Sequence, residues 1–267
     1  MNCNNNSNLD EKREWFRSSD EVKVGFIEGV TFGSKQVEYS VLNNRGIFEG
    51  DIDLGPVDKI PEEPIFINEG VAIPGERFRW PNGRVPFKID PGVPTETQKF
   101  IINAIKHWEI YTPIRFIQRT SNNAHQFTDF IKFTWGDRCW SNIGRIGGEQ
   151  IIELAEGCEF GAAVHEIGHA IGLWHEQSRE DRNQNIRILW QNIEVGKEFN
   201  FNQHITDGDD IGSYDFNSIM HYGAYAFSKN GKPTIETLGG QQIGQRKGLS
   251  PGDIKAVLTL YPQLAPV

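Results

Sequence analysis

The 267-residue sequence contains little cysteine, fewer basic than acidic side chains and no long hydrophobic run. Because no apolar stretch approaches about 18 residues, no membrane-spanning helix is expected. Its 27 lysines and arginines against 36 aspartates and glutamates give a net charge of −9. A nucleic-acid-binding protein usually presents a basic face, so nucleic acid is disfavoured as a partner. With 37% hydrophobic residues, 17 of the 267 residues being phenylalanine, the composition is typical of a globular protein.

The three cysteines are Cys3, Cys139 and Cys158. Cys139 and Cys158 could pair, and a disulfide closing a loop of that size stabilises a fold by about 3 kcal/mol in the chain-entropy model. The alternative is two separate buried thiols. A disulfide implies an oxidising compartment. No apolar signal segment begins the sequence, so the protein is either cytosolic or has lost its signal, and we favour a secreted protein.

A change in pattern divides the chain near residue 70. Before it, short β-type runs over residues 22–27 and 37–42 are separated by glycine and asparagine, and the proline-rich acidic stretch 56–64 is typical of a linker or extended arm. After it, the sequence indicates one compact domain. We therefore expect two parts, residues 1–70 and residues 71–267.

Within the second part, Thr95 and Gln98 resemble a helix capping box, and apolar residues recur at helical spacing over 100–108. Their stripe predicts core packing. Strands are expected over 115–117, 130–134 and 150–154, a second helix over about 160–172, and a last helix over 251–261.

The most informative segment is His165-Glu166-Ile167-Gly168-His169, which continues to His175. Histidines four residues apart on a helix share one face and can bind one ion, and the carboxylate of Glu166 beside them can take a proton from a water molecule. Gly172 allows the turn that brings His175 back as a third ligand. Three neutral nitrogens leave one position open, as a catalytic zinc site requires. A chance H-E-x-x-H match is expected only about 0.015 times in such a chain.

A second segment supports the first. Ser218-Ile219-Met220-His221-Tyr222 follows in the irregular part of the chain. A thioether at Met220 packs well beneath an imidazole cluster, and the phenol of Tyr222 could ligate the metal or stabilise an oxyanion. Without the upstream histidines, this segment would be an ordinary strand end.

With these motifs the sequence resembles the astacin family of metzincin metallopeptidases over residues 71 to 262. The resemblance is carried by the zinc motif extended to Glu176, by the S-x-M-H-Y segment, and by residues 139–141, 145–148, 244–246 and 249–254. It implies an α+β fold with a twisted mixed sheet, two long helices around a cleft and an irregular C-terminal subdomain, preceded by an extended prosegment. The resemblance extends in particular to a bacterial member of the family in its zymogen form.

The resemblance also implies the roles of the site residues. One Zn²⁺ would be bound by the three histidines, with Glu166 as general base. Tyr222 would be a displaceable ligand that swings toward the transition state, and Met220 would form the turn beneath the metal. Glu176 would bind the buried amino terminus after activation.

Further features follow from the same resemblance. Cys139 and Cys158 would form one family disulfide, but a second is missing because Pro113 stands where a partner cysteine is expected. Arg246 could line the S1′ pocket and favour acidic side chains, or it could be a solvated loop arginine.

The resemblance implies a latent precursor, since Phe48-Glu49-Gly50-Asp51 is similar to a prosegment motif whose aspartate takes the open zinc position. The mature chain would then begin near Val71. Cys3 competes with Asp51, and we favour it slightly, because thiolate is usually the tighter zinc ligand. Cys3 could alternatively carry a lipid anchor or be a free thiol.

The expected protein is therefore a monomeric zinc endopeptidase that acts on proteins or peptides after an activating protease has cut it. The rival interpretation is a non-catalytic binding module with structural zinc, for which four protein ligands are usual. A further rival is a zinc hydrolase that acts on another class of substrate, and only the family resemblance argues against it.

Overall fold

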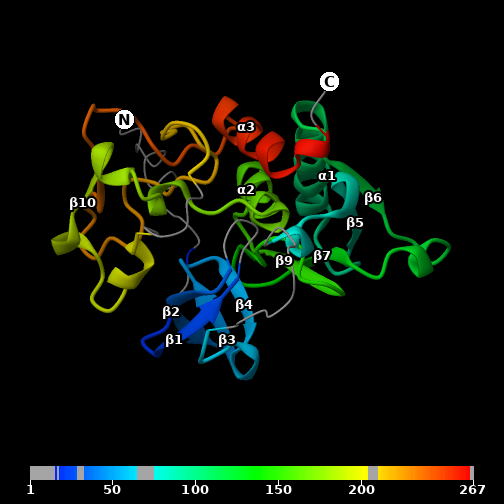
Figure 1. The fold of residues 1–267 in the computed structure, drawn as a ribbon, viewed down its shortest axis with the longest axis horizontal. Helices are drawn as coiled ribbons and strands as arrows, with labels where there is room; N and C mark the ends of the chain where they lie inside the picture. The colour runs from blue at the N-terminus through cyan, green and yellow to red at the C-terminus, as the bar shows by residue number, and fades with distance from the viewer. Residues whose placement is uncertain (1–15, 17, 29–32, 65–74, 204–209, 265–267) are drawn as a thin grey trace, which may run out of the picture.

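A computed structural model describes residues 16, 18–28, 33–64, 75–203 and 210–264. The expected α+β class with a mixed sheet is confirmed, since strands and helices form a nine-stranded sheet in the order β1-β2-β3-β4-β8-β9-β7-β5-β6, a two-stranded sheet and three α-helices (Figure 1). The strands are β1 Val22–Ile27, β2 Lys35–Leu42, β3 Arg45–Phe48, β4 Ile52–Pro56, β5 Arg84–Ile89, β6 Arg115–Gln118, β7 Phe130–Trp135, β8 Trp140–Ser141, β9 Glu149–Leu154, β10 Ile186–Ile188 and β11 Ile235–Thr237. The helices are α1 Thr95–Tyr111, α2 Phe160–Ile171 and α3 Pro251–Leu260.

The described residues before position 65 form a small sheet, so this part is more compact than the extended arm that the sequence suggested. Its strands β1 to β4 pair antiparallel in sequence order, and we call them the N-terminal sheet. Asn43 and Asn44, with φ of 52° and 60°, form the tight turn between β2 and β3 that left-handed asparagines favour. Ile60, from the stretch expected to be a linker, is buried over this sheet, and a Cβ on Gly25 or Gly46 would lie within 2.7 or 2.4 Å of its side chain.

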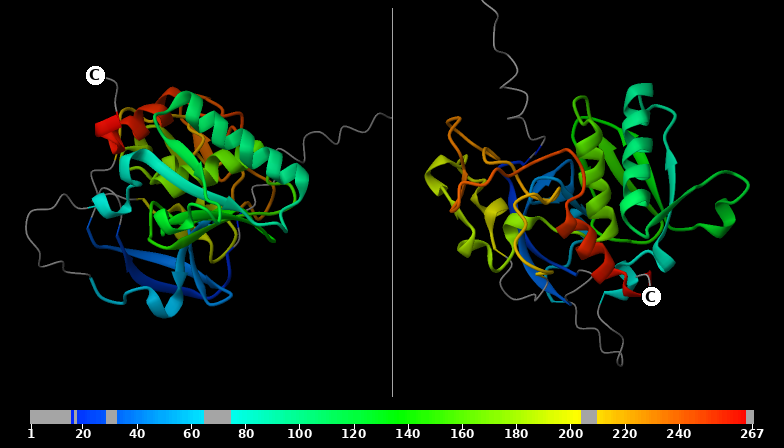
Figure 2. Two further views of the ribbon diagram at one scale, coloured as in Figure 1. Left: turned by 90° about the vertical axis from the view of Figure 1, so that its right-hand side faces the viewer. Right: turned by 90° about the horizontal axis from the view of Figure 1, so that it is seen from above.

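The N-terminal sheet is joined to the strands of the larger domain by one pairing. Ile52 of β4 pairs in parallel with Ser141 of β8, and the Ser141 amide donates to the Asp51 carbonyl oxygen at 3.0 Å. Figure 2 shows the N-terminal sheet, in blue, below the rest of the molecule. This junction places the β3–β4 connection against the larger domain.

The helices α1 and α2 pack together over the parallel strands β5, β6, β7 and β9 (Figure 2). The predicted apolar stripe is confirmed as core, since Ile101, Ala104, Ile105 and Trp108 are buried. Trp108 fixes the helix pair, because its indole Nε1 donates to the Val164 carbonyl at 3.1 Å. This contact holds α2 rigidly where the metal motif begins.

The predicted capping box at the start of α1 was wrong. Pro94 is the residue that precedes α1, no side chain caps it, and Gln98 instead donates from Nε2 to the Val93 carbonyl at 2.8 Å. A capping box occurs on α3, where Ser250 Oγ accepts from the Asp253 amide and Asp253 Oδ2 accepts from the Ser250 amide. The second and last helices, α2 and α3, end within one residue of the predicted bounds.

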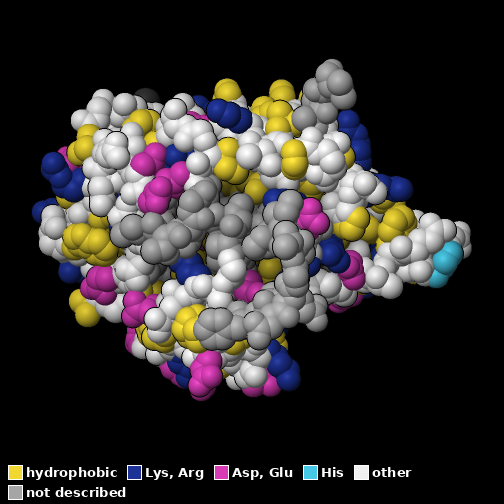
Figure 3. Space-filling model, viewed as in Figure 1, with side chains coloured by type: hydrophobic (Ala, Val, Ile, Leu, Met, Phe, Trp, Pro, Cys, Tyr) yellow, Lys and Arg dark blue, Asp and Glu magenta, His cyan; other side chains and the backbone are white. Residues whose placement is uncertain are grey.

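Beyond α2 the chain is irregular, as expected, and forms a second apolar core around Phe201 and Tyr222. Cys139 and Cys158 form the expected disulfide near the start of α2. Among the described residues, no helix is both long and apolar enough to cross a membrane. Figure 3 shows acidic and basic side chains interspersed over the face in view.

Candidate metal centre

Helix α2 and the turn after it bring the three histidines together. His165 and His169 lie one helical turn apart, with ring centroids 4.7 Å from each other. The helix ends at Gly172, whose φ of +111° is a left-handed conformation that glycine adopts without strain. The chain then reverses, and the His175 ring lies 4.7 Å from the His169 ring and 5.3 Å from the His165 ring.

The carboxylate of Asp51 lies among these rings. Its Oδ2 is 3.3 Å from His165 Nε2 and 3.2 Å from His175 Nε2, and its Oδ1 is 3.7 Å from His169 Nε2. All four side chains are buried, and their ligand atoms lie within 4.8 Å of one another. Burial raises the pKa of Asp51, but the three histidines outweigh it and hold the pKa below its usual range, so the ligand is anionic.

This donor set fits a zinc ion. Four ligand atoms about 2.1 Å from a tetrahedral zinc ion lie about 3.4 Å from one another. Asp51 Oδ2 lies 3.3 and 3.2 Å from two of the imidazole nitrogens, close to this value, and all four ligand atoms lie within 4.8 Å of one another. Among the described residues, the buried atoms Asp51 Oδ1 and His169 Nε2 have no hydrogen-bond partner. Buried polar atoms normally have one, and a bound cation would satisfy both. Imidazole with one carboxylate is a donor set that suits zinc.

The outer nitrogen of each ring is held, which leaves Nε2 directed at the metal. Such contacts fix the tautomer and orientation of a metal-binding histidine. Each Nδ1 faces an oxygen acceptor: Ile219 O at 2.8 Å from His165, Leu173 O at 2.8 Å from His169, and Glu49 Oε2 at 2.7 Å from His175.

Glu49 makes three contacts in the site, and sequence reasoning missed them. Besides accepting from His175, its carboxylate accepts a hydrogen bond from Ser178 Oγ, and its carbonyl oxygen accepts from the Tyr222 hydroxyl. Glu49 and Gly50 have φ of 46° and 79°, so the chain turns sharply just before Asp51. Its place two residues before Asp51 was the only sequence signal.

Glu166 is 2% exposed, and its Oε2 has no hydrogen-bond partner among the described residues. Burial, together with the charge of Asp51, raises its pKa well above the usual value. A carboxylate in this state can exchange a proton, which is the property that a general base needs.

Met220 packs directly beneath α2. A Cβ on Gly168 would lie 2.5 Å from Met220 Sδ, so the glycine in the motif makes room for the thioether. The Tyr222 ring lies 4.7 Å from the His175 ring. The sequence singled out Met220 and Tyr222 but gave no reason for glycine at position 168.

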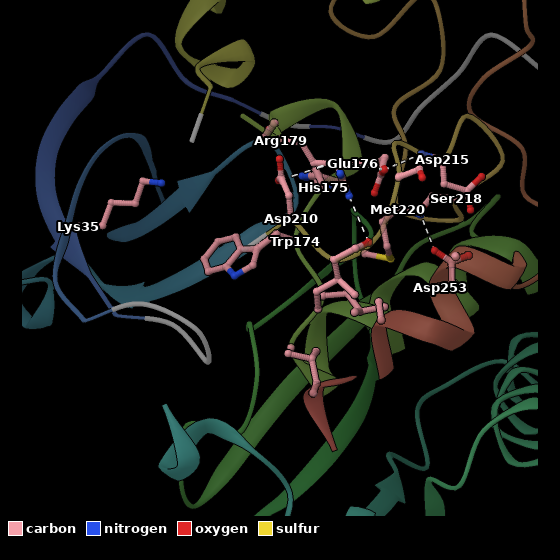
Figure 4. Close-up of a pocket in the computed structure, with 18 of the residues that line it drawn as sticks. Lys35, Trp174, His175, Glu176, Arg179, Asp210, Asp215, Ser218, Met220 and Asp253 are labelled. Atoms are coloured by element: carbon pink, nitrogen blue, oxygen red, sulfur yellow. Dashed lines mark hydrogen bonds and ion pairs between the residues drawn. The ribbon is translucent and has the colours of Figure 1, made fainter. Parts of the chain in front are cut away.

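Glu176 lines a cavity of about 100 Å³ that His175 and Met220 also line (Figure 4). Its Oε1 accepts from the Asp215 amide at 2.7 Å and lies 3.6 Å from Arg179 Nε. Burial raises the pKa of Glu176 to about 8. Ile27 and Lys35 of the N-terminal sheet also line the cavity, and Figure 4 shows Lys35 on the side opposite Asp253.

Arg246 is half-buried against the segment that carries Met220. Its Nη1 donates to the carbonyl oxygens of Ile219 at 3.3 Å, His221 at 3.1 Å and Gln245 at 3.0 Å. Cys3 and Val71, the other residues on which the sequence raised expectations, lie outside the described residues.

Comparison with known proteins identifies the family. Residues 73–262 match the model of Astacin, a peptidase family, and the chain therefore belongs to the astacin family. Blastula protease 10 of Paracentrotus lividus is 43% identical over 197 residues, which are 70% of this chain and 32% of that protein. Zinc metalloproteinase nas-6 of Caenorhabditis elegans is 37% identical over 236 residues, which are 85% of this chain and 66% of that protein. The chain thus spans about a third of the first relative and just under two thirds of the second.

Solved structures agree on the fold. The hatching enzyme zinc-protease HCE-1 of Oryzias latipes, at 36% identity, matches with a TM-score of 0.62 over 69% of this chain and 92% of that one. Myroilysin matches with a TM-score of 0.50 over 70% of this chain and 97% of that one, but at 23% identity, so this likeness shows the fold alone. With the family match, these likenesses place the chain in the astacin peptidase family and its fold.

Proposed function

We propose that the chain is the latent precursor of a zinc-dependent endopeptidase. The observation that carries the proposal is the Asp51 carboxylate among three histidine Nε2 atoms, at 3.2, 3.3 and 3.7 Å, beside a buried Glu166. Membership of a peptidase family gives the substrate class, proteins or peptides. His165, His169 and His175 would hold the ion, and Asp51 would hold the fourth position.

The chain's own residues would divide the work of hydrolysis. When bound, zinc supplies Lewis-acid chemistry that polarises the scissile carbonyl and lowers the pKa of the attacking water toward about 7. Glu166 accepts the proton of that water and passes it to the leaving amine. Tyr222, released from the Glu49 carbonyl, would donate a hydrogen bond from its hydroxyl to the developing oxyanion, and losing one such donor costs about 3 kcal/mol.

Latency would come from the N-terminal sheet. Asp51 fills the position that a substrate carbonyl needs, and the hydrogen bonds of Glu49 hold the same segment against His175 and Tyr222. Cutting near Val71 would release the sheet. Cys3 is the alternative blocking ligand.

Glu176 would bind the amino terminus created by that cut. The cavity that it lines supports this role, because a largely buried carboxylate beside a cavity is stabilised by a paired ammonium group. N-terminal sequencing of trypsin-activated protein tests it, since a first residue far from Val71 would contradict the assignment.

Two finer assignments complete the proposal. The disulfide between Cys139 and Cys158 supports a secreted protein.

Arg246 would contribute to the S1′ pocket, which its position beside the Ile219 and His221 carbonyls supports. An unchanged preference at the P1′ position in Arg246→Ala would contradict this role.

The activity is tested by comparing wild type and Glu166→Ala on casein after limited proteolysis of the full chain. We expect Glu166→Ala to keep its zinc and to lose about 10²- to 10⁴-fold in turnover. Glu159→Ala, which changes an exposed carboxylate at the start of the same helix, is the control and should retain activity. Wild-type turnover in Glu166→Ala, or no hydrolysis by the processed wild type, would favour the binding-module interpretation.

A further inference from the structure

An aromatic side chain from the start of the described chain lies next to the metal centre. The ring of Phe16 lies 4.4 Å from the Tyr222 ring and is stacked on the Phe227 ring at 5.2 Å, with 13° between the planes. Its edge-to-face distance to His175 is 6.5 Å. Phe16 therefore packs against the larger domain. One of its neighbours there, Tyr222, lies next to the histidine His175 of the metal centre.

The surface that receives Phe16 is formed almost entirely by residues of the larger domain. Behind Tyr222 and Phe227 lies Phe201, which is 0% exposed and 5.8 and 6.0 Å from their rings. The fourth side is Gly50, where a Cβ would come within 2.7 Å of Phe227 and 3.0 Å of Phe16. Phe16 and Gly50 both precede residue 70, whereas the three aromatic walls follow it.

The conformation of Phe227 supports a role beyond packing. Its φ of +50° is rare for a bulky residue, and such strain costs about 1 to 3 kcal/mol and tends to occur at functional sites. The Glu194 amide donates to the Phe227 carbonyl at 2.9 Å and helps hold this backbone in place. The Phe227 ring is thus held against Phe16 and Tyr222 at a cost in stability.

The segment after Phe16 is anchored to the same domain. Lys197 donates from Nζ to the Ser19 carbonyl at 2.6 Å and to Asp20 Oδ1 at 3.1 Å. Ser19 Oγ in turn donates to the Val41 carbonyl of β2 at 2.5 Å. These contacts hold Ser19, three residues after Phe16, against the same domain.

We propose that Phe16 occupies a substrate subsite, and that the surface of Tyr222, Phe227 and Phe201 receives an aromatic side chain of the peptide substrate after the N-terminal segment leaves. This inference rests on the proposed endopeptidase function and adds a specificity to it. An extended peptide advances about 3.3 Å per residue, and the ring lies 6.5 Å from the His175 ring. The aromatic residue would therefore stand within about two positions of the scissile bond.

Both cleavage and binding test the subsite. The full chain is activated by limited proteolysis, and matched peptides with Phe or Ala at each position from P3 to P3′ are compared by kcat/KM. We expect Phe to be favoured about tenfold at one position, and Phe227→Ala to reduce that ratio to about threefold or less. Phe227→Tyr, which keeps the ring, and Phe216→Ala, which removes an aromatic residue of the same apolar core outside this surface, should keep the ratio.

A binding measurement separates this inference from the catalytic proposal. N-acetylphenylalanine amide and N-acetylalanine amide are titrated into the activated chain and followed by NMR. Tighter binding of the phenylalanine compound, lost in Phe227→Ala, supports the subsite even if no peptide is hydrolysed. Equal binding of the two compounds, or cleavage without aromatic preference at any tested position, overturns the subsite and leaves the endopeptidase function standing.

Discussion

Glu49 accepts a hydrogen bond from Nδ1 of His175 at 2.7 Å, so a residue of the β3–β4 connection supports a histidine of the candidate metal centre. The outer nitrogens of His165 and His169 instead face backbone carbonyls of the astacin domain itself. His175 is therefore the histidine that would lose its hydrogen-bond partner if the N-terminal segment were removed. This contact would link the proposed latency to the metal site independently of Asp51.

Changing Glu49 to glutamine should weaken zinc binding by the full-length chain. The glutamine amide carries no negative charge, so it cannot strengthen His175 as a metal ligand in the way that the carboxylate does. Loss of such an outer contact costs about 10- to 100-fold in metal affinity. Competition with a chelator of known affinity measures the effect. Glu63→Gln, which changes an exposed acidic residue before position 65, is the control. Equal zinc affinities of the wild type and both variants would contradict the role of Glu49.

Replacing Asp51 with alanine should open the fourth metal position without any cleavage of the chain. The unprocessed variant should then bind a small hydroxamate, while the unprocessed wild type should not, because the carboxylate lies 3.2 to 3.7 Å from all three imidazoles. Asp58→Ala, at an exposed position, is the control. A variant that stays closed to hydroxamate would show that another group, with Cys3 as the first candidate, blocks the metal.

Gly168→Ala should destabilise the full-length chain although alanine is the better helix former. The new Cβ would meet Met220 Sδ at 2.5 Å in a closely packed core, and overpacking costs about 1 to 3 kcal/mol. Denaturant unfolding measures the loss. In a Met220→Ala background the same change should cost less, and a full cost there would rule out the thioether as the cause.

His107 should make stability fall in mild acid. Its Nε2 accepts from the Leu249 amide at 3.0 Å, and burial lowers its pKa below 6.5. The unfolded chain therefore binds the proton more readily, so this contribution is complete above about pH 6.5 and is lost as pH falls through the lower folded-state pKa. Thermal unfolding between pH 7.5 and 5 should show a smaller acid loss in His107→Gln, and identical pH profiles would contradict the prediction.

The sequence predicted the parts of the site that follow from local spacing. Histidines at positions 165 and 169 share a helix face whatever surrounds them, and the glycine at position 172 indicates the turn to His175. The paired cysteines and the apolar stripe ending at Trp108 were predictable in the same way. These features depend on residues close together in the chain or on a recurring period.

Long-range contacts could not be predicted in this way. Whether Asp51 or Cys3 approaches the metal depends on how the N-terminal strands pair, and a proline-rich stretch gave no sign that Ile60 would be buried over them. The contacts of Glu49 with His175 and of Phe16 with Phe227 join residues more than a hundred positions apart, and they depend on tertiary packing. Thr95 fitted a capping pattern, but Pro94 before it leaves Thr95 inside the helix.

Zinc K-edge X-ray absorption on the full-length, unprocessed chain tests the central claim most directly. The account predicts one zinc per chain with three imidazole nitrogens and one carboxylate oxygen, all at about 2.0 to 2.2 Å. A sulfur neighbour at about 2.3 Å would contradict the assignment of Asp51 as the blocking ligand. A chain that takes up no zinc would contradict the metal centre itself.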